Sequence, residues 1–418
     1  MDPIKHVIVL MLENHSFDQM LGFMGLTNPD INGVDESRYN VNPNDNSKVY
    51  QVPSSAMSEQ NDPMHELGDM LDQMKNNNGH FVSNYVARYP DATRDQIQEV
   101  MGYYKDGEFP ALHTLAKHFM VCDNWFASMP GPTWPNRAFA HTGTSIGYTD
   151  MPDSGEIPHI PIYDQDTVYD LLQDNDISWR IYFDEVPQSI VLLHQLEYLD
   201  NYSDMCYFEE DCKGPAADFP AYVFIEPNYF GDNENDQHPP SNLMNGDILI
   251  AKVYNAIRSN AELWESSLLI ITYDENGGFY DHVTPPKTVA PDRHTIEFDF
   301  KILGFRVPAI LVSPLVKTGV DHTLYDHTSI LRYLCDKWAL DTPCLGKRVL
   351  AANTFEHLLH YYPGHVSPES LPVGTHVPNI ASARNTGEYA MDMVKDRMDS
   401  ASDETKGKAN KFKFSLIK

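Results

Sequence analysis

Two continuous apolar runs constrain the folds open to this chain. Residues 6–12 and 267–273 are rich in β-branched and aliphatic side chains and lack polar alternation, which is typical of strands buried on both faces. Similar runs occur at 221–225 and 307–312, and amphipathic helices are predicted at 167–174, 246–259 and 328–334. Strands alternating with helices predict an α/β fold with a mainly parallel central sheet and helices on both faces.

Each of the two longest runs ends in an acidic pair. Glu13-Asn14 follows the first run and Asp274-Glu275 follows the second. Ligands of open α/β sheets bind beyond the carboxyl ends of the strands. If the two strands are neighbours, three carboxylates and one amide converge there, and they repel one another unless a cation lies among them. The alternative is that one residue of each pair caps a following helix.

The segment Gly131–Arg137 carries the candidate nucleophile. Its glycine and two prolines restrict the backbone around Thr133. A hydroxyl is a weak nucleophile at neutral pH, and metal coordination is one way to activate it. Arg137 could offer a bidentate fork to phosphate oxygens. The alternative is a structural proline turn with an inert threonine.

Histidines supply the remaining candidate chemistry. His65, His238 and His327 follow polar loop sequences, and phosphoester cleavage needs a proton donor for the leaving oxygen. His282 follows Asp281, which could orient its ring. Equally, His282 could only tie down its loop.

The charge balance excludes some partners. The chain has 60 acidic and 30 basic residues, a formal charge of −30, which argues against nucleic acid and against anionic membranes. The five cysteines contain no CxxC pair. Cys206 and Cys212 could pair in an oxidising compartment, although an odd total is untypical of a disulfide framework.

Composition also predicts the domain layout. We expect a single domain over 1–395 with polar surface insertions near 35–64 and 145–165, followed by a mobile, lysine-rich tail at 396–418. No apolar stretch reaches the 18 residues of a membrane span. The apolar start is shorter than a signal-peptide core, so no leader is visible in this numbering, although export remains the expected location, with the cytoplasm as the alternative.

Four motifs occur in an order that resembles a known family: Glu13–Asp18, Thr133–Arg137, Tyr273–Pro286 and Gly304–Pro308. The set is similar to the phosphoesterase family of bacterial phospholipases C, plant non-specific phospholipases C and certain bacterial acid phosphatases. The resemblance implies an alkaline-phosphatase-like fold. It also implies a divalent metal held by Glu13, Asn14, Asp274 and Glu275, with Thr133 as the metal-contacting nucleophile and His65 and His238 in the active site. His15 departs from the arginine that the family usually has.

The resemblance implies hydrolysis of glycerophospholipids to diacylglycerol and a phosphorylated headgroup through a phospho-threonine. The acidic surface disfavours anionic lipids, so we expect phosphatidylcholine as the preferred substrate and transient contact with membrane surfaces. Zinc is favoured by resemblance, whereas hard oxygen ligands also suit calcium, magnesium or manganese. The alternatives are an acid phosphatase and a non-catalytic protein that binds metal or a phospho-headgroup. A sulfatase is disfavoured because Thr133 cannot become formylglycine. The oligomeric state is open.

Overall fold

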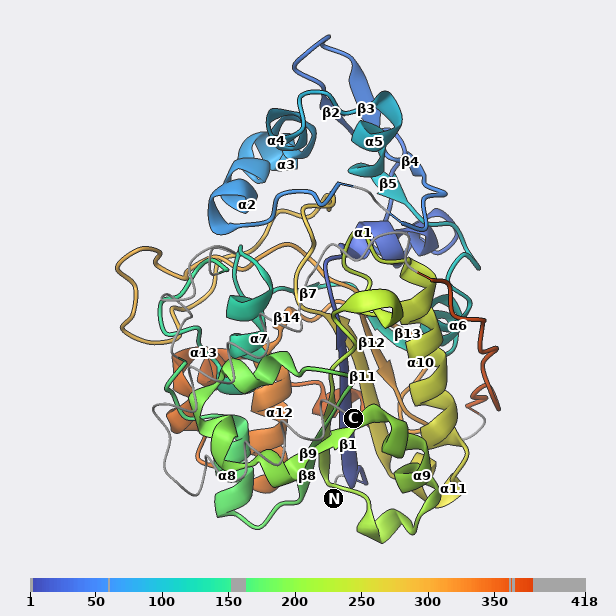
Figure 1. The fold of residues 1–418 in the computed structure, drawn as a ribbon, viewed down its shortest axis with the longest axis vertical. Coiled ribbons are helices and arrows are strands. Elements are labelled where there is room, and N and C mark those ends of the chain that lie inside the picture. The colour runs from blue at the N-terminus through green and yellow to red at the C-terminus, as the bar shows by residue number, and fades with distance from the viewer. Residues whose placement is uncertain (1–2, 59–60, 152–162, 361, 363–364, 379–418) are drawn as a thin grey trace.

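The computed structural model describes residues 3–58, 61–151, 163–360, 362 and 365–378, and its centre is an eight-stranded sheet (Figure 1). The strand order is β13-β6-β12-β11-β1-β10-β8-β9. The bounds are β13 Gly319–Asp321, β6 Met120–Cys122, β12 Ala309–Val312, β11 Ser267–Tyr273, β1 His6–Leu12, β10 Tyr222–Ile225, β8 Trp179–Phe183 and β9 Tyr202–Asp204. The expected α/β fold with a mainly parallel sheet is confirmed.

The two strands that precede the acidic pairs are neighbours at the centre of this sheet. β1 and β11 pair in parallel, from His6 opposite Ser267 to Leu12 opposite Tyr273. Every residue of both strands is buried. Because the strands end at the same level, Glu13 and Asp274 leave the sheet side by side.

One predicted strand runs in the opposite direction. β12 is antiparallel to both β11 and β6, so its carboxyl end lies at the far edge of the sheet, where Ser313 Oγ donates to the carbonyl of Ser267 at 2.7 Å. The segment that enters β12, which contains Arg306, therefore lies at the edge where β1 and β11 end.

Helices cover both faces of the sheet, as expected (Figure 1). One face carries α6 Pro110–His118, α9 Phe208–Lys213, α10 Leu243–Arg258 and α11 Ala261–Glu265, and the other carries α7 Thr133–Thr142, α8 Val168–Asp174, α12 Thr328–Trp338 and α13 Gly346–Ala351. The three predicted helices are present as α8, α10 and α12. α10 begins earlier than predicted, because Asn242 caps it by accepting from Met244 N.

Above the carboxyl ends of β1 and β11 lies a second body of structure, here called the upper lobe (Figure 1). It consists of β2 Tyr39–Val41, β3 Lys48–Tyr50, β4 Val52–Pro53, α2 Leu67–Gln73, α3 Lys75–Asn78, α4 Phe81–Arg88, α5 Arg94–Glu99 and β5 Gly102–Tyr103. Its apolar cluster includes Phe81 and Ile97 and extends to Tyr280 and Phe305 of the main body. The predicted insertion at 35–64 is thus part of a larger packed unit.

Part of one predicted insertion and the whole predicted tail lie beyond what the structure describes. Residues 152–162 of the 145–165 insertion, and the 396–418 tail, lie outside the described residues. All five cysteines are described and free, with Cys206 exposed and Cys212 buried, so the possible bridge between them is not formed.

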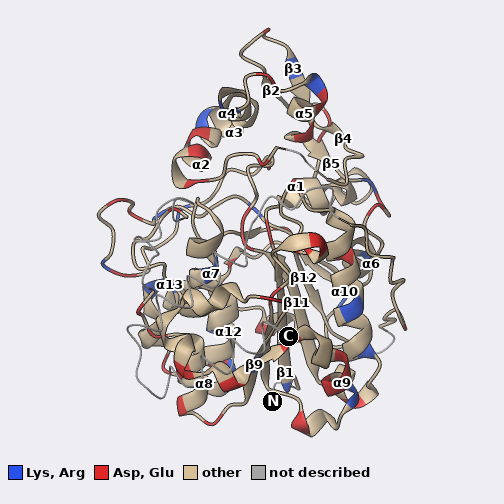
Figure 2. Ribbon diagram, viewed as in Figure 1, with Lys and Arg blue, Asp and Glu red and all other residues tan. Residues whose placement is uncertain are grey.

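Among the described helices, none has the length and apolar character needed to cross a membrane. The ribbon in Figure 2, on which Asp and Glu are red, shows acidic residues in both the upper lobe and the main body.

Candidate functional site

The four predicted metal-binding residues converge at the ends of β1 and β11. Glu13, Asn14, Asp274 and Glu275 are all fully buried. The backbone N–H of Asn14 donates to Asp274 Oδ1 at 3.2 Å. Neither pair caps a helix, because α1 (Phe17–Met20) is capped by Ser16 and β11 is followed in the described chain by loop up to β12. Helix capping therefore does not explain these residues.

The buried cluster of Glu13, Asn14, Asp274 and Glu275 has too little positive charge around it to keep all of its carboxylates ionised. Burial raises the pKa of Asp274 to about 7, even though Arg137 opposes the shift. Burial also raises the pKa of Glu275 well above its usual range, and the charge of Asp274 adds to this effect. Among the described residues, Asn14 Oδ1 and Glu275 Oε1 are buried without a hydrogen-bond partner. Oxygen donors without partners, crowded with carboxylates, fit a divalent cation.

Thr133 lies at the start of α7, where the preceding loop is tightly held. Asn136 donates through Nδ2 to the carbonyls of Gly131 (2.8 Å) and Pro132 (3.2 Å). Its Oδ1 accepts from Met129 N at 3.1 Å. These bonds, together with the prolines, hold the backbone that presents the Thr133 hydroxyl.

Arg137, one helical turn beyond Thr133 and on the same face of α7, is bonded to the strand ends. Its Nε donates to Asp274 Oδ2 at 3.1 Å, and Nη2 donates to the carbonyls of Met11 and Leu12. Nη2 also lies 3.6 Å from Glu13 Oε1. The Arg137 guanidinium, predicted to bind phosphate oxygens, thus mainly donates to oxygens of the protein. Among the described residues, only its Nη1 atom lacks a hydrogen-bond partner.

His65 and His238 come together, with Asp62 as a third member that the sequence interpretation did not assign. One ligand atom from each of the three residues lies within 4.8 Å of the others. His238 Nε2 is 3.6 Å from Asp62 Oδ2, and His65 Nε2 is 3.4 Å from Asn14 Nδ2. Burial opposes protonation of His65, but the carboxylates of Glu275 and Asp62 outweigh it and raise its pKa to about 9.

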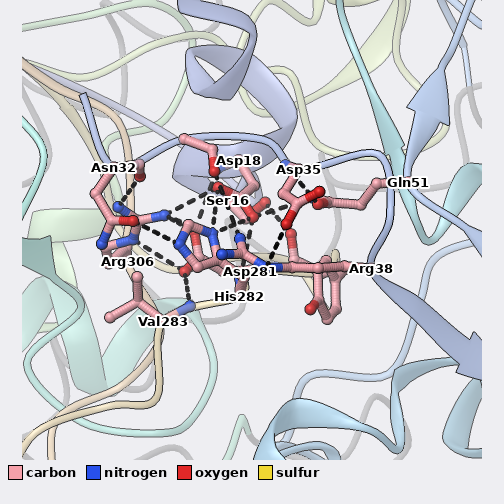
Figure 3. A network of polar contacts seen from close by, with 12 residues as sticks. Ser16, Asp18, Asn32, Asp35, Arg38, Gln51, Asp281, His282, Val283 and Arg306 are labelled. Carbon is pink, nitrogen blue, oxygen red and sulfur yellow. Dashed lines mark hydrogen bonds and ion pairs between the residues drawn. The ribbon is translucent and has the colours of Figure 1, made fainter. Parts of the chain in front are cut away.

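The structure places His282 in a different network (Figure 3). Its Nδ1 lies 2.8 Å from Asp18 Oδ2, and its Nε2 lies 2.8 Å from Asn32 Oδ1. Asp281, proposed above to orient His282, instead accepts from Arg306 Nε at 2.9 Å. Both ring nitrogens of His282 are engaged, which supports a loop-tethering role over acid–base catalysis.

This network joins the two loops that carry the acidic pairs. Arg306 is fully buried, and its Nη2 also donates to Asp18 Oδ1 at 2.9 Å. Ser16 Oγ donates to the carbonyl of Tyr280 at 2.8 Å. Gly277, at φ +61°, approaches the Asn14 carbonyl so closely that a Cβ would lie 2.1 Å from it. The relative position of the pairs therefore depends on contacts made several residues away.

Two further residues support the cluster directly. Gln188 Nε2 donates to Glu13 Oε1 at 2.6 Å. His327 Nε2 lies 2.6 Å from the carbonyl of Asp274, and Trp125 Nε1 donates to His327 Nδ1 at 3.4 Å. His327 is thus a buried support of the strand end. No local pattern around either residue points to these distant partners.

A model of the phosphoesterase family matches residues 4–341. Non-specific phospholipase C6 of Arabidopsis thaliana is 35% identical over 410 residues, which cover 92% of this chain and 76% of that protein. Phospholipase C B of Mycobacterium tuberculosis is 28% identical over 401 residues, which cover 82% of this chain and 74% of that protein.

Solved structures are more distant. The lipoteichoic acid synthase LtaP from Listeria monocytogenes overlays with a TM-score of 0.41 and 12% identity, covering 83% of this chain and 76% of that chain. A protein in the alkaline phosphatase superfamily from Vibrio parahaemolyticus overlays with a TM-score of 0.36 and 11% identity. The overlay covers 58% of this chain and 64% of that chain.

Proposed function

This chain belongs to the phosphoesterase family and is a phosphoric ester hydrolase, and we propose that it acts as a metal-dependent phospholipase C through Thr133. The observation that carries the proposal is the convergence of two buried acidic pairs beside the helix that begins at Thr133. Arg137 supports it further, because its bond to Asp274 holds that helix against the strand ends.

In the proposed reaction, the Thr133 hydroxyl releases its proton to solvent, its oxygen attacks phosphorus in line, and the bond to the leaving alcohol breaks. His238 donates a proton to that alcohol, releasing diacylglycerol from a phospholipid. The product is a phosphodiester on Thr133 that carries the headgroup. Water then attacks phosphorus and gives a proton back to His238, while the Thr133 oxygen leaves and takes a proton from solvent. The phosphorylated headgroup then departs. His65, whose Nε2 lies 3.4 Å from Asn14 Nδ2 at the edge of the cluster, would hold phosphate oxygens electrostatically in its protonated form.

The residues that would hold a divalent cation are Glu13, Asn14, Asp274, Glu275 and Thr133. When bound, the cation would neutralise phosphate charge and lower the pKa of the Thr133 hydroxyl. We favour zinc on the resemblance to the phosphoesterase family alone, because all five proposed ligands are oxygen donors, which also suit harder cations. Calcium, magnesium and manganese are the alternatives that elemental analysis of the purified protein would distinguish.

The substrate preference is proposed as phosphatidylcholine ahead of anionic lipids, supported by the formal charge of −30. An acid phosphatase acting on monoesters is the second candidate, because the same nucleophile and acidic pairs serve both reactions. Parallel assays of phosphatidylcholine, phosphatidylserine and a soluble monoester separate them. Turnover of the monoester alone would favour the phosphatase.

The direct test is capture of the intermediate. Rapid acid quench during turnover, followed by peptide mass spectrometry, should place a phosphorylated headgroup on Thr133. Thr133→Ala should abolish both the adduct and turnover, while Thr142→Ala, at the other end of α7, keeps both. Turnover by Thr133→Ala, or a headgroup adduct on another residue, would defeat the assignment of the nucleophile. Absence of hydrolysis on any phosphoester would favour the non-catalytic alternative.

A further inference from the structure

Gln237, which directly precedes the proposed proton donor His238, is held in a strained backbone conformation. Its φ is +74°, in the left-handed region that residues other than glycine rarely adopt. Such a conformation persists only where the surrounding structure holds it. Gln237 is fully buried, and Gly246 of α10 makes room for it, because a Cβ on Gly246 would lie 2.3 Å from Gln237 Cγ. The loop that carries His238 is thus built around a buried, strained glutamine.

The side chain of Gln237 is bonded to two elements of the main body. Its Oε1 accepts from the Tyr273 hydroxyl at 2.5 Å, and its Nε2 donates to the carbonyl of Leu243 at 2.7 Å. Tyr273 is the last residue of β11 and Leu243 is the first of α10. The side chain therefore ties the His238 loop to the strand end that carries one acidic pair.

The main chain of Gln237 is bonded to His15, which directly follows the other acidic pair. His15 is fully buried, and its Nε2 lies 2.9 Å from the carbonyl oxygen of Gln237. Because a carbonyl can only accept, His15 Nε2 is the donor. The His15 ring stacks on Phe279 with centroids 5.3 Å apart, and its Nδ1 lies 2.6 Å from the side-chain amide of Gln19. The ring is therefore fixed in the orientation that bonds Gln237.

His15 acts on the peptide plane that joins Gln237 to His238. The carbonyl oxygen of Gln237, the N–H of His238 and the Cα of His238 all belong to this rigid plane. His15 bonds the oxygen, and Asp236 Oδ1 accepts from the N–H at 2.9 Å. Both edges of the plane are held, so the Cα of His238 is fixed in place.

We propose that His15 is a positioning residue, which places His238 through the Gln237 carbonyl and so speeds protonation of the leaving alcohol without touching substrate. His238 Nδ1 lies 2.5 Å from the carbonyl of Pro239 and keeps its hydrogen there, so the proton for the leaving oxygen comes from Nε2. A displacement of about 1 Å at a reacting group can cost roughly 100-fold in rate. The inference rests on the proposed function, because it needs His238 as the proton donor.

The test compares two esters of phosphocholine that differ in the leaving group. p-Nitrophenolate departs without a proton, whereas the alcohol of a short-chain phosphatidylcholine needs one. His15→Phe keeps a stacked ring but loses the bond to Gln237. We expect its kcat/KM to fall roughly 10- to 100-fold on the lipid and less than about twofold on the nitrophenyl ester. His15→Gln, whose Nε2 can still donate, should keep most of the lipid rate.

His6→Phe is the matched control. His6 lies at the other end of β1, is also buried, and its Nδ1 lies 3.0 Å from the carbonyl of Pro220. This variant should keep the wild-type ratio of the two rates. In a His238→Ala background, His15→Phe should cause no further selective loss, because both changes act on the same proton transfer. If His15→Phe does not fold, His15→Asn replaces it, since its shorter side chain cannot reach the Gln237 carbonyl.

The outcomes separate the inference from the proposed function. A selective loss in His238→Ala without one in the His15 variants, or equal losses on both esters in those variants, would overturn the inference and leave the proposed hydrolysis standing. If His238→Ala itself shows no selective loss, its assignment as proton donor fails, and the inference falls with it. If only monoesters are hydrolysed, p-nitrophenyl phosphate and glycerol phosphate give the same comparison.

Discussion

The Nε atom of Arg137 donates a 3.1 Å hydrogen bond to Oδ2 of Asp274, so the helix that begins at Thr133 is bonded to the end of strand β11. The same guanidinium bonds the carbonyls of Met11 and Leu12 on β1. One buried side chain thus holds the nucleophile's helix against both acidic strand ends.

Replacing Arg137 by Lys should therefore disturb the site while keeping the charge. A lysine cannot reproduce the forked contacts, so we expect metal affinity to fall roughly 10- to 100-fold, as for other residues that orient metal ligands. Metal content after dialysis is the measurement. Arg332→Lys, in a surface pair with Asp336, is the matched control and should change nothing in metal content. Full metal retention by Arg137→Lys would contradict this role.

Removing the metal should abolish turnover and lower the thermal stability. Asp274 and Glu275 repel each other at the buried site, and a cation present at a hundredfold excess over its Kd adds about 3 kcal/mol to the free energy of unfolding. Chelation followed by calorimetry should show a lower Tm, which readdition of metal restores. Glu275→Gln should respond much less to chelation. An unchanged Tm and full activity after exhaustive chelation, with no metal detected, would end the metal hypothesis.

The network around Arg306 predicts a dependence of stability on pH. Burial alone would raise the pKa of Asp18, but the charges of His282 and Arg306 outweigh it and lower the pKa to about 2. A pKa lowered by folding stabilises the protein above the unfolded-state value, and this stability is lost as pH falls toward 2. Relative to wild type, Asp18→Asn should lose about 2 kcal/mol of unfolding free energy at pH 7 and roughly half of that at pH 3.

Urea unfolding of both proteins across this pH range measures the effect. Asp72→Asn, on the surface of the upper lobe beside Lys75, is a suitable control and should show a small deficit at every pH. A deficit of Asp18→Asn that grows toward low pH would contradict the assignment of the charges.

Gly277 predicts a sharp steric effect. Its φ of +61° and its contact with the Asn14 carbonyl leave no room for a Cβ, so Gly277→Ala should lower the free energy of unfolding by about 2–4 kcal/mol and weaken metal binding. Gly68→Ala is the contrasting variant, because it lies in α2 with open space around it. It should stabilise the protein by about 0.5–1 kcal/mol through helix propensity. Equal effects of the two changes in chemical denaturation would refute the steric argument.

Local residue patterns were sufficient to predict the central strands and the chemistry at their ends. The runs that became β1 and β11 were recognised with their bounds, because burial on both faces requires continuous apolar residues, and that pattern is local. Glu13-Asn14 and Asp274-Glu275 stood out for the same reason, as acids directly after buried strands.

The pairs of distant residues that meet in the fold could not be predicted in this way. An apolar run does not encode the direction of a strand, so the antiparallel orientation of β12 could not be predicted from residues 307–312. For the same reason, the sequence did not predict that Arg306 lies at the edge of the sheet where β1 and β11 end. The pairing of His282 with Asp18, and of Asp62 with His238, likewise joins loops whose sequences carry no mark of one another. Such contacts follow from how the upper lobe and the sheet pack together, and packing depends on the whole chain.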